Sequence, residues 1–169
     1  MLLTLATVST IARPSDVQEV AFFCRISDDV PATMVRTPQG ELVIIHWNSD
    51  QLNESEFTVE ELCEQVSQRF QTYYDTGELN YITTGRMNRQ LVACVAEREG
   101  GACKGLLFTL NSKSKPRLAL QRVLRIRVPT EGPINETTGR VYVNFEEYLS
   151  GQYSSWLNPF NPLESPGSY

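Results

Sequence analysis

The sequence predicts a single α+β domain in which a mostly antiparallel sheet packs on one long and one shorter helix and is held by two disulfides. Three observations predict this class. Short strand-like runs bounded by turn residues recur along the chain. One segment, residues 58–75, repeats its apolar residues at helical spacing. Four cysteines lie within or beside these elements and form no CxxC motif.

The length and composition agree with one domain. The chain has 169 residues, of which 41% are hydrophobic, enough to bury a single core. No apolar run approaches the roughly 20 residues that a membrane-spanning helix needs. We divide the chain into an N-terminal segment, a folded domain and a flexible tail rich in Pro, Ser and Asn, over residues 1–19, 20–150 and 151–169.

The N-terminal segment is apolar and made of small residues from Leu2 to Ala12. It resembles the hydrophobic region of a secretory signal, without the basic residues that normally precede one. Two interpretations stay open. We favour the end of a signal whose start lies upstream, and the alternative is a strand of the fold.

Three strands are expected first, over residues 21–26, 33–37 and 41–47. Residues 27–31 form a turn, and residues 37–40, with the sequence TPQG, join the second and third strands into a hairpin. Residues 48–55 are polar and predict a loop.

The clearest helix begins after Thr58 and ends near Asp75. Thr58 and Glu61 have the spacing of a capping box, and Gly77 is a natural C-terminal stop. The expected buried stripe is Val59, Leu62, Cys63, Val66, Phe70 and Tyr73.

Further strands are expected over residues 79–84, 90–96 and 104–110, with a turn over residues 85–89. A second helix opens at Ser114, has Pro116 in its first turn and continues to about Arg127. Its expected apolar residues are Leu118, Leu120, Val123 and Leu124. Residues 129–139 predict a loop, residues 141–145 a last strand and residues 146–149 a short turn or helix.

The four cysteines are the most informative residues, and we favour two disulfides between them. If residues 97–100 turn a hairpin, Cys94 and Cys103 face each other across the ladder, and Cys24 then meets Cys63 on the helix. The pairings Cys24–Cys94 with Cys63–Cys103, and Cys24–Cys103 with Cys63–Cys94, stay open. Two disulfides imply an oxidising compartment, whereas four reduced thiols in the cytosol are the alternative.

The net charge of −5 conceals a segregation of charge along the chain. Residues 86–127 hold ten basic and two acidic residues, a formal charge of +8, whereas the remainder holds five basic and eighteen acidic residues, or −13. We expect a basic surface that binds an anionic membrane or an acidic protein, although ordinary solvated cations explain the same pattern. Nucleic acid is not an expected partner. The candidate residues are Arg86, Arg89, Lys104, Lys113, Lys115, Arg117, Arg122, Arg125 and Arg127.

Catalytic signals are weak. His46, Ser49 and Asp50 are too close in sequence to assemble a triad, whose members come from separate elements. We therefore interpret His46 and Trp47 as the end of a strand. The alternative is a thiol-dependent or hydrolytic enzyme that uses Cys63 or His46, which requires Cys63 to be free.

A third interpretation is a module that binds a small ligand or a glycan through Trp47 and three tyrosines. These are Tyr73, Tyr74 and Tyr81. With one histidine and no CxxC pair, we expect no metal and no cofactor.

Several segments together resemble a known family. They are FFC at 22–24, PATMVRTPQGE at 31–41, CEQVSQRFQTYYDTGELNYITTG at 63–85, VACVA at 92–96, GGACKGLLFTL at 100–110 and RVYVNFEEYL at 140–149. Over residues 20–150 the chain resembles the cyanobacterial circadian oscillating polypeptide domain family. The sequence departs from the family pattern at Leu62, where arginine is expected, and at Arg89, where glycine is expected.

The resemblance implies a small cyanobacterial protein, usually made with a signal peptide, whose founding member is membrane-associated and oscillates daily in abundance. It implies no activity, and the four cysteines are the positions that it carries over. We therefore expect a non-enzymatic, disulfide-stabilised extracytoplasmic protein of the periplasm or thylakoid lumen, peripheral on a membrane or membrane complex.

Overall fold

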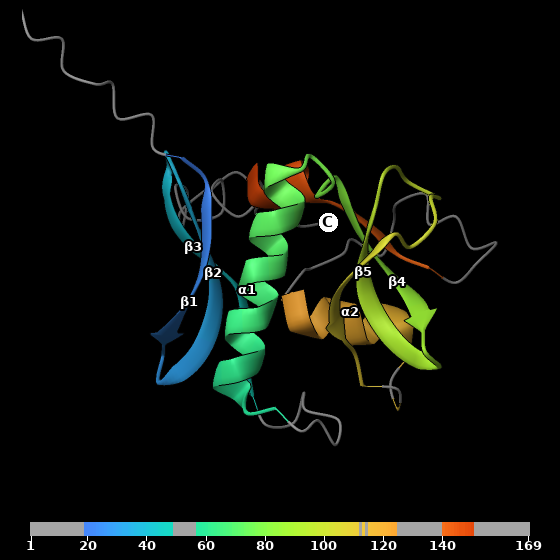
Figure 1. Cartoon of the computed structure of the whole chain (residues 1–169), viewed down its shortest axis with the longest axis horizontal. Helices are drawn as coiled ribbons and strands as arrows, with labels where there is room; N and C mark the ends of the chain where they lie inside the picture. The colour runs from blue at the N-terminus through green and yellow to red at the C-terminus, as the bar shows by residue number, and fades with distance from the viewer. Residues whose placement is uncertain (1–18, 49–56, 112, 114, 125–139, 151–169) are drawn as a thin grey trace, which may run out of the picture.

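Two separate antiparallel sheets form in the part of the chain that the computed structural model describes, which is residues 19–48, 57–111, 113, 115–124 and 140–150 (Figure 1). The first sheet has the order β1 (Ala21–Ser27), β2 (Val30–Thr37), β3 (Gly40–His46). The second has the order β6 (Gly105–Thr109), β5 (Gln90–Ala96), β4 (Tyr81–Met87), β7 (Tyr142–Asn144). The α+β class is correct, but the expected sheet is two sheets. Each is built mainly from hairpins between consecutive strands, and α1 (Val59–Asp75) separates β3 from β4 in the chain.

Two of the hairpins close through two-residue turns with left-handed backbone. Asp28 and Asp29 join β1 to β2, and Asn88 and Arg89 join β4 to β5, all four with positive φ. Two left-handed residues match the twist of antiparallel strands, as in a type I′ turn. The expected turn over residues 85–89 was therefore too long, because residues 85–87 belong to β4 and Met87 pairs directly with Gln90.

Helix α1 begins and ends where the sequence predicts. The Thr58 hydroxyl accepts from the Glu61 amide, and the Glu61 carboxylate accepts from the Thr58 amide. At the other end Gly77 has φ 71°, and the Glu78 amide bonds back to the Tyr73 carbonyl. Cys63, Val66 and Phe70 of the expected stripe are fully buried, and its other three members are partly buried against the core.

Helix α1 lies between an edge strand of each sheet. On one side the Gln71 side chain accepts from the Phe22 amide of β1 at 2.7 Å. On the other side Arg69 donates to the Leu107 carbonyl of β6 at 2.9 Å, and the Tyr73 hydroxyl donates to the Leu106 carbonyl. These side chains satisfy backbone groups that an edge strand otherwise presents to solvent or to another chain.

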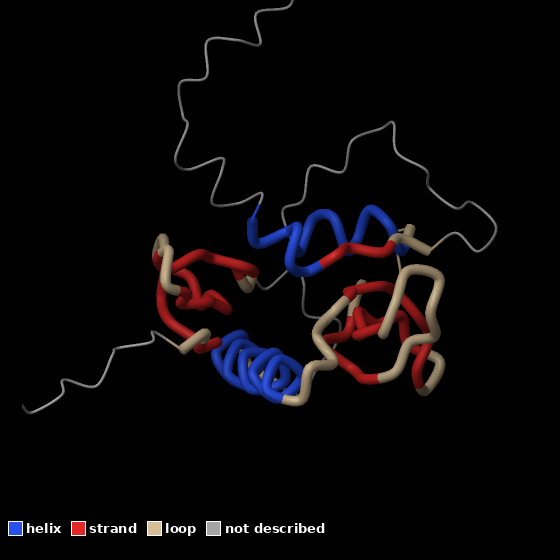
Figure 2. The backbone as a smooth tube through the Cα atoms, turned by 90° about the horizontal axis from the view of Figure 1, so that it is seen from above, coloured by secondary structure: helices blue, strands red, loops and turns tan. Residues whose placement is uncertain are grey.

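Two further helical segments lie on the opposite side of the molecule from α1, as Figure 2 shows with α1 seen end-on. They are α2 (Pro116–Leu124) and residues 145–150, so the described chain has three helical segments. The fold class named one long and one shorter helix, and the last segment was expected as a short turn or helix over residues 146–149. Pro116 is the first residue of α2, while Ser114 and residues 125–127 lie outside the described residues. None of the helices in the described ranges reaches the length and apolarity that a bilayer span requires.

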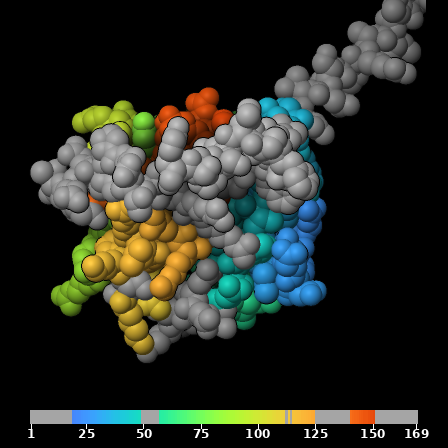
Figure 3. All heavy atoms as spheres, turned by 180° about the vertical axis from the view of Figure 1, so that it is seen from behind, coloured from blue at the N-terminus to red at the C-terminus, as the bar shows by residue number. Residues whose placement is uncertain are grey.

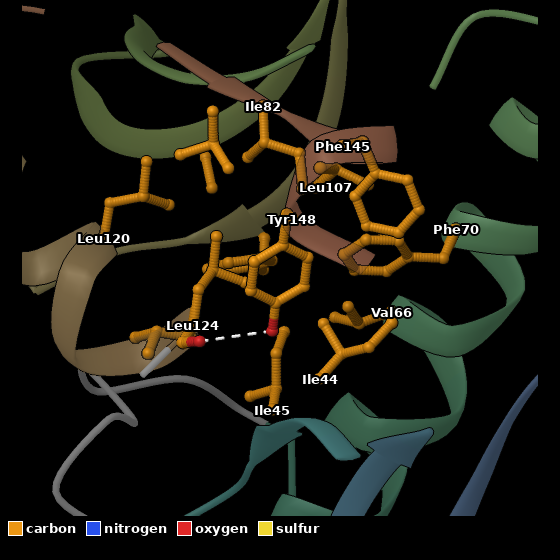
Figure 4. Packing of buried hydrophobic residues seen from close by; sticks show 14 of the residues in the cluster. Ile44, Ile45, Val66, Phe70, Ile82, Leu107, Leu120, Leu124, Phe145 and Tyr148 are labelled. Atoms are coloured by element: carbon orange, nitrogen blue, oxygen red, sulfur yellow. Dashed lines mark hydrogen bonds between the residues drawn. The ribbon is translucent and has the colours of Figure 1, made fainter. Parts of the chain in front are cut away.

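The core fills the space between the two sheets and the helices (Figure 4). A row of aromatic rings crosses it, with centroids 5.5 Å apart for Phe22 and Phe70, 5.9 Å for Phe70 and Phe145, and 6.0 Å for Phe145 and Tyr148. The Tyr148 hydroxyl donates to the Leu124 carbonyl at the end of α2. The row therefore connects β1, α1, the last helical segment and α2.

Some of the sequence predictions concern segments that lie wholly or mostly outside the described residues. These are the signal-like segment over residues 1–18, most of the loop over residues 48–55, and the tail from residue 151 onward. The loop over residues 129–139 also lies outside them.

Candidate functional site

All four cysteines form disulfides in the structure, with the pairing that the sequence favoured. Cys24 of β1 is bonded to Cys63 on the buried face of α1, and Cys94 of β5 is bonded to Cys103. The first bridge joins the three-stranded sheet to the long helix. Two disulfides indicate an oxidising, extracytoplasmic compartment.

The geometry around the second bridge differs from the expected one. Cys94 and Cys103 do not face each other across the ladder, because Cys94 is opposite Leu106 and Cys103 precedes Gly105, the first residue of β6. Cys103 instead lies in the connection before β6, so the bridge ties this connection to β5. A Cβ atom at Gly85 of β4 would come within 2.8 Å of the Cys103 sulfur, which explains glycine at that position.

The expected end of a strand at His46 and Trp47 is confirmed. His46 is the last residue of β3, 6% exposed, with its Nε2 3.6 Å from the Asp28 carboxylate. The buried Trp47 indole donates to the Thr33 hydroxyl, which also accepts from Ser67 on α1. Ser49 and Asp50 lie outside the described residues.

These placements bear on the two alternative functions. Cys63 is fully buried and disulfide-bonded, so the structure holds no free thiol there. Trp47 is 2% exposed and packs edge-on against Phe108, so it presents no ring to a glycan at the surface. Among the described residues, no group of three His, Cys, Asp or Glu side chains is placed to hold a metal ion.

The candidate basic residues are distributed over both ends of the four-stranded sheet. Arg86 is near the end of β4 and Arg89 is in the β4–β5 turn. Lys113 and Lys115 lie between β6 and α2, and Arg117 is in the first turn of α2. Since the Leu110 amide bonds to the Leu91 carbonyl, the chain leaves β6 at the same end of the sheet as the β4–β5 turn. We call these five residues the basic end.

Lys104 does not belong to the basic end. Its amide bonds to the Val95 carbonyl, four residues further along β5 than Leu91, which is about 13 Å at the usual rise of a strand. Its ammonium is 2.7 Å from the Glu97 carboxylate. This hydrogen bond lowers the pKa of Glu97, and the charge of Lys104 acts in the same direction.

The basic end has a high local charge. Four of its members are exposed and Arg117 is partly buried. None of the five takes part in an ion pair within the described part of the chain. Arg122 extends the basic surface along α2, while Arg125 and Arg127 lie outside the described residues.

Leu118 on α2, one of the apolar residues expected in the second helix, is an apolar member of this surface. It is 47% exposed, whereas Leu120, Val123 and Leu124 are buried. It precedes Arg122 by four residues, so the two share one face of the helix, and Lys115 lies directly before the first residue of α2. The sequence contains a signal for this exposure, because helical spacing places Leu118 on the face of α2 opposite to the buried Leu120 and Leu124. Figure 3 shows α2 in orange on the rear of the molecule.

The chain was also compared with known proteins. The family model for circadian oscillating protein COP23 matches residues 21–150, in agreement with the resemblance that the sequence motifs indicate. No curated protein and no solved structure was found to match the chain. Because the family model covers well over half of the sequence, the chain belongs to the circadian oscillating protein COP23 family.

Proposed function

We propose that this protein is a non-enzymatic, extracytoplasmic protein of the periplasm or thylakoid lumen that docks peripherally on an anionic membrane through its basic end. The disulfides support the compartment, since disulfides are rare in proteins of a reducing cytosol. The basic end supports the mode of docking.

The observation that carries the proposal is the grouping of Arg86, Arg89, Lys113, Lys115 and Arg117 at one end of the four-stranded sheet, without ion-pair partners in the described chain. Each cation near an anionic lipid surface contributes about 1 kcal/mol of binding free energy. Five cations therefore supply several kcal/mol at low salt, enough for reversible binding.

Leu118 favours a lipid surface over an acidic protein. It is exposed between Lys115 and Arg122, and an apolar side chain among cations is the pattern of proteins that bind at the membrane interface. The cations lie near the headgroups in this arrangement, and the leucine enters the boundary with the acyl chains.

Co-sedimentation of the full chain with vesicles tests the proposal. We expect binding to vesicles that contain phosphatidylglycerol, no binding to pure phosphatidylcholine, and release at 1 M salt, where the screening length falls to about 3 Å. The K113Q/K115Q variant should bind at least tenfold more weakly, because it loses two cations at about 1 kcal/mol each.

Lys104→Gln is the matched control, since Lys104 lies at the other end of the same sheet and is paired with Glu97. Equal binding to neutral and anionic vesicles would contradict the proposal, as would equal weakening by K104Q and by K113Q/K115Q. A salt wash of isolated membranes checks the native location. Protein that stays on the membrane at high salt would rule out an electrostatic attachment.

A further inference from the structure

The β4–β5 turn contains a residue that is poorly suited to its backbone conformation. Asn88 and Arg89 form the whole turn, with φ 49° and 66°. A turn of this kind prefers asparagine followed by glycine, because a Cβ atom in the left-handed region approaches the following carbonyl oxygen. Asn88 fits this preference and Arg89 does not.

The other left-handed positions in the described chain show the contrast. Gly40, Gly77 and Gly100 occupy three of them. Asp28 and Asp29 occupy the β1–β2 turn, and aspartate tolerates this region because its short side chain bonds to the local backbone. Arg89 is the one residue with a long side chain among the described positive-φ positions.

No side-chain hydrogen bond or ion pair of Arg89 is found within the described chain. Arg89 is exposed, and no described ion pair, disulfide or ring contact involves it. A strained residue without a polar partner in the described chain points to a role outside the molecule. Its position agrees with this, because the turn is the extreme end of a hairpin at the basic end (Figure 1).

We propose that Arg89 is the principal lipid-contacting residue of this protein and binds the phosphate group of an anionic lipid, with Arg86 beside it in the same hairpin. This inference rests on the proposed function and assigns its main contact. A guanidinium presents a planar pair of N–H donors that matches two phosphate oxygens, which a lysine ammonium does not. At the tip of a two-residue turn this group reaches a flat surface before the body of the sheet does.

The proposal predicts opposite effects of one substitution on stability and on binding. Arg89→Gly relieves the left-handed backbone, so the thermal midpoint of unfolding should rise by about 2–4 °C. The affinity for phosphatidylglycerol vesicles should fall about fivefold or more. Arg89→Lys keeps the charge and the backbone strain but lacks the planar pair of N–H donors. Its affinity for the vesicles should therefore lie between those of the unmodified protein and R89G.

Asn88→Gly is the matched control. It relaxes the same turn without removing a charge, so vesicle affinity should not change. A merely structural role for Arg89 would lower stability in R89G, and that result would overturn the inference.

The outcome also separates this inference from the proposed function. If R89G binds vesicles like the unmodified protein while K113Q/K115Q binds weakly, the assignment of Arg89 is wrong and membrane docking stands. If neither R89G nor K113Q/K115Q loses affinity, both the assignment of Arg89 and the proposed membrane docking are wrong. If R89G binds vesicles normally but is lost from isolated membranes, its partner there is an acidic protein, which overturns the lipid assignment.

Discussion

At the level of single residues, Glu41 on β3 pairs with two arginines on the outer face of the three-stranded sheet. Its carboxylate lies 2.7 Å from Arg25 and 2.8 Å from Arg36, and both guanidiniums lie over the Phe23 ring, at 5.5 and 5.0 Å from its centroid. These two arginines are therefore partnered within the fold. Within the described residues, the cations of the basic end have no ion-pair partner, so they are available for contacts outside the molecule.

The pH dependence of stability tests this cluster. The hydrogen bond from Arg36 lowers the pKa of Glu41 below its ordinary value of 4.5, and Arg25 acts in the same direction. A carboxyl with a lower pKa in the folded protein stabilises it above the unfolded pKa, and that stability is lost as the pH falls through the folded pKa. Glu41→Gln should therefore destabilise the protein at pH 7, and the difference should shrink below about pH 4.5.

Urea unfolding of both proteins between pH 7 and pH 3 measures this difference. Glu99→Gln, at an exposed glutamate in the connection after β5, is the control. A difference between the Glu41 variant and the unmodified protein that stays constant over this range would mean that the ion pairs contribute nothing.

At the level of elements, α1 shows what local sequence decides. Its capping box, its glycine stop and its buried stripe are all local patterns, and each was predicted correctly. The favoured Cys24–Cys63 pairing placed the first strand against this helix, but the polar contacts could not be predicted, because Gln71 and Arg69 bond to strands 49 and 38 residues away. Long polar side chains on a helix usually face solvent, and here two of them complete the edges of sheets.

Replacing Gln71 tests this role of the helix. Gln71→Leu removes the acceptor for the Phe22 amide and should cost about 1–2 kcal/mol of unfolding free energy. Hydrogen exchange at Phe22 should accelerate, because its amide loses its partner at the edge of β1. The control is Gln68→Leu, at an exposed position on the same helix. Equal exchange at Phe22 in the two variants would show that the edge does not depend on Gln71.

At the scale of the whole molecule, the two disulfides differ in what they connect. Cys24–Cys63 closes a separation of 39 residues and joins the first sheet to the long helix, whereas Cys94–Cys103 closes 9 residues within the second sheet. The longer loop restricts the unfolded chain more strongly.

Removal of each bridge should follow this order. C24A/C63A should lose about 4 kcal/mol of unfolding free energy and C94A/C103A about 3 kcal/mol, from the loop-closure entropy of the unfolded chain. Denaturant unfolding of the two double variants under oxidising conditions measures both values. The reverse order would mean that local packing, such as that of Gly85 against Cys103, outweighs chain entropy.

The sequence by itself determined the α+β class, the three-strand meander at the start, both ends of α1, the favoured disulfide pairing and the family. The strands and helix ends among these depend on turn residues, caps and periodicity, whose physical causes act within a few residues. Only the tertiary structure decided that the strands form two sheets and that Cys103 lies outside the ladder, in the connection before β6. It also divided the basic segment, placing Lys104 beside Glu97 at one end of the sheet and the basic end at the other. Such features depend on which distant segments of the chain come together in the fold. A linear pattern of charge or hydropathy does not show which segments these are.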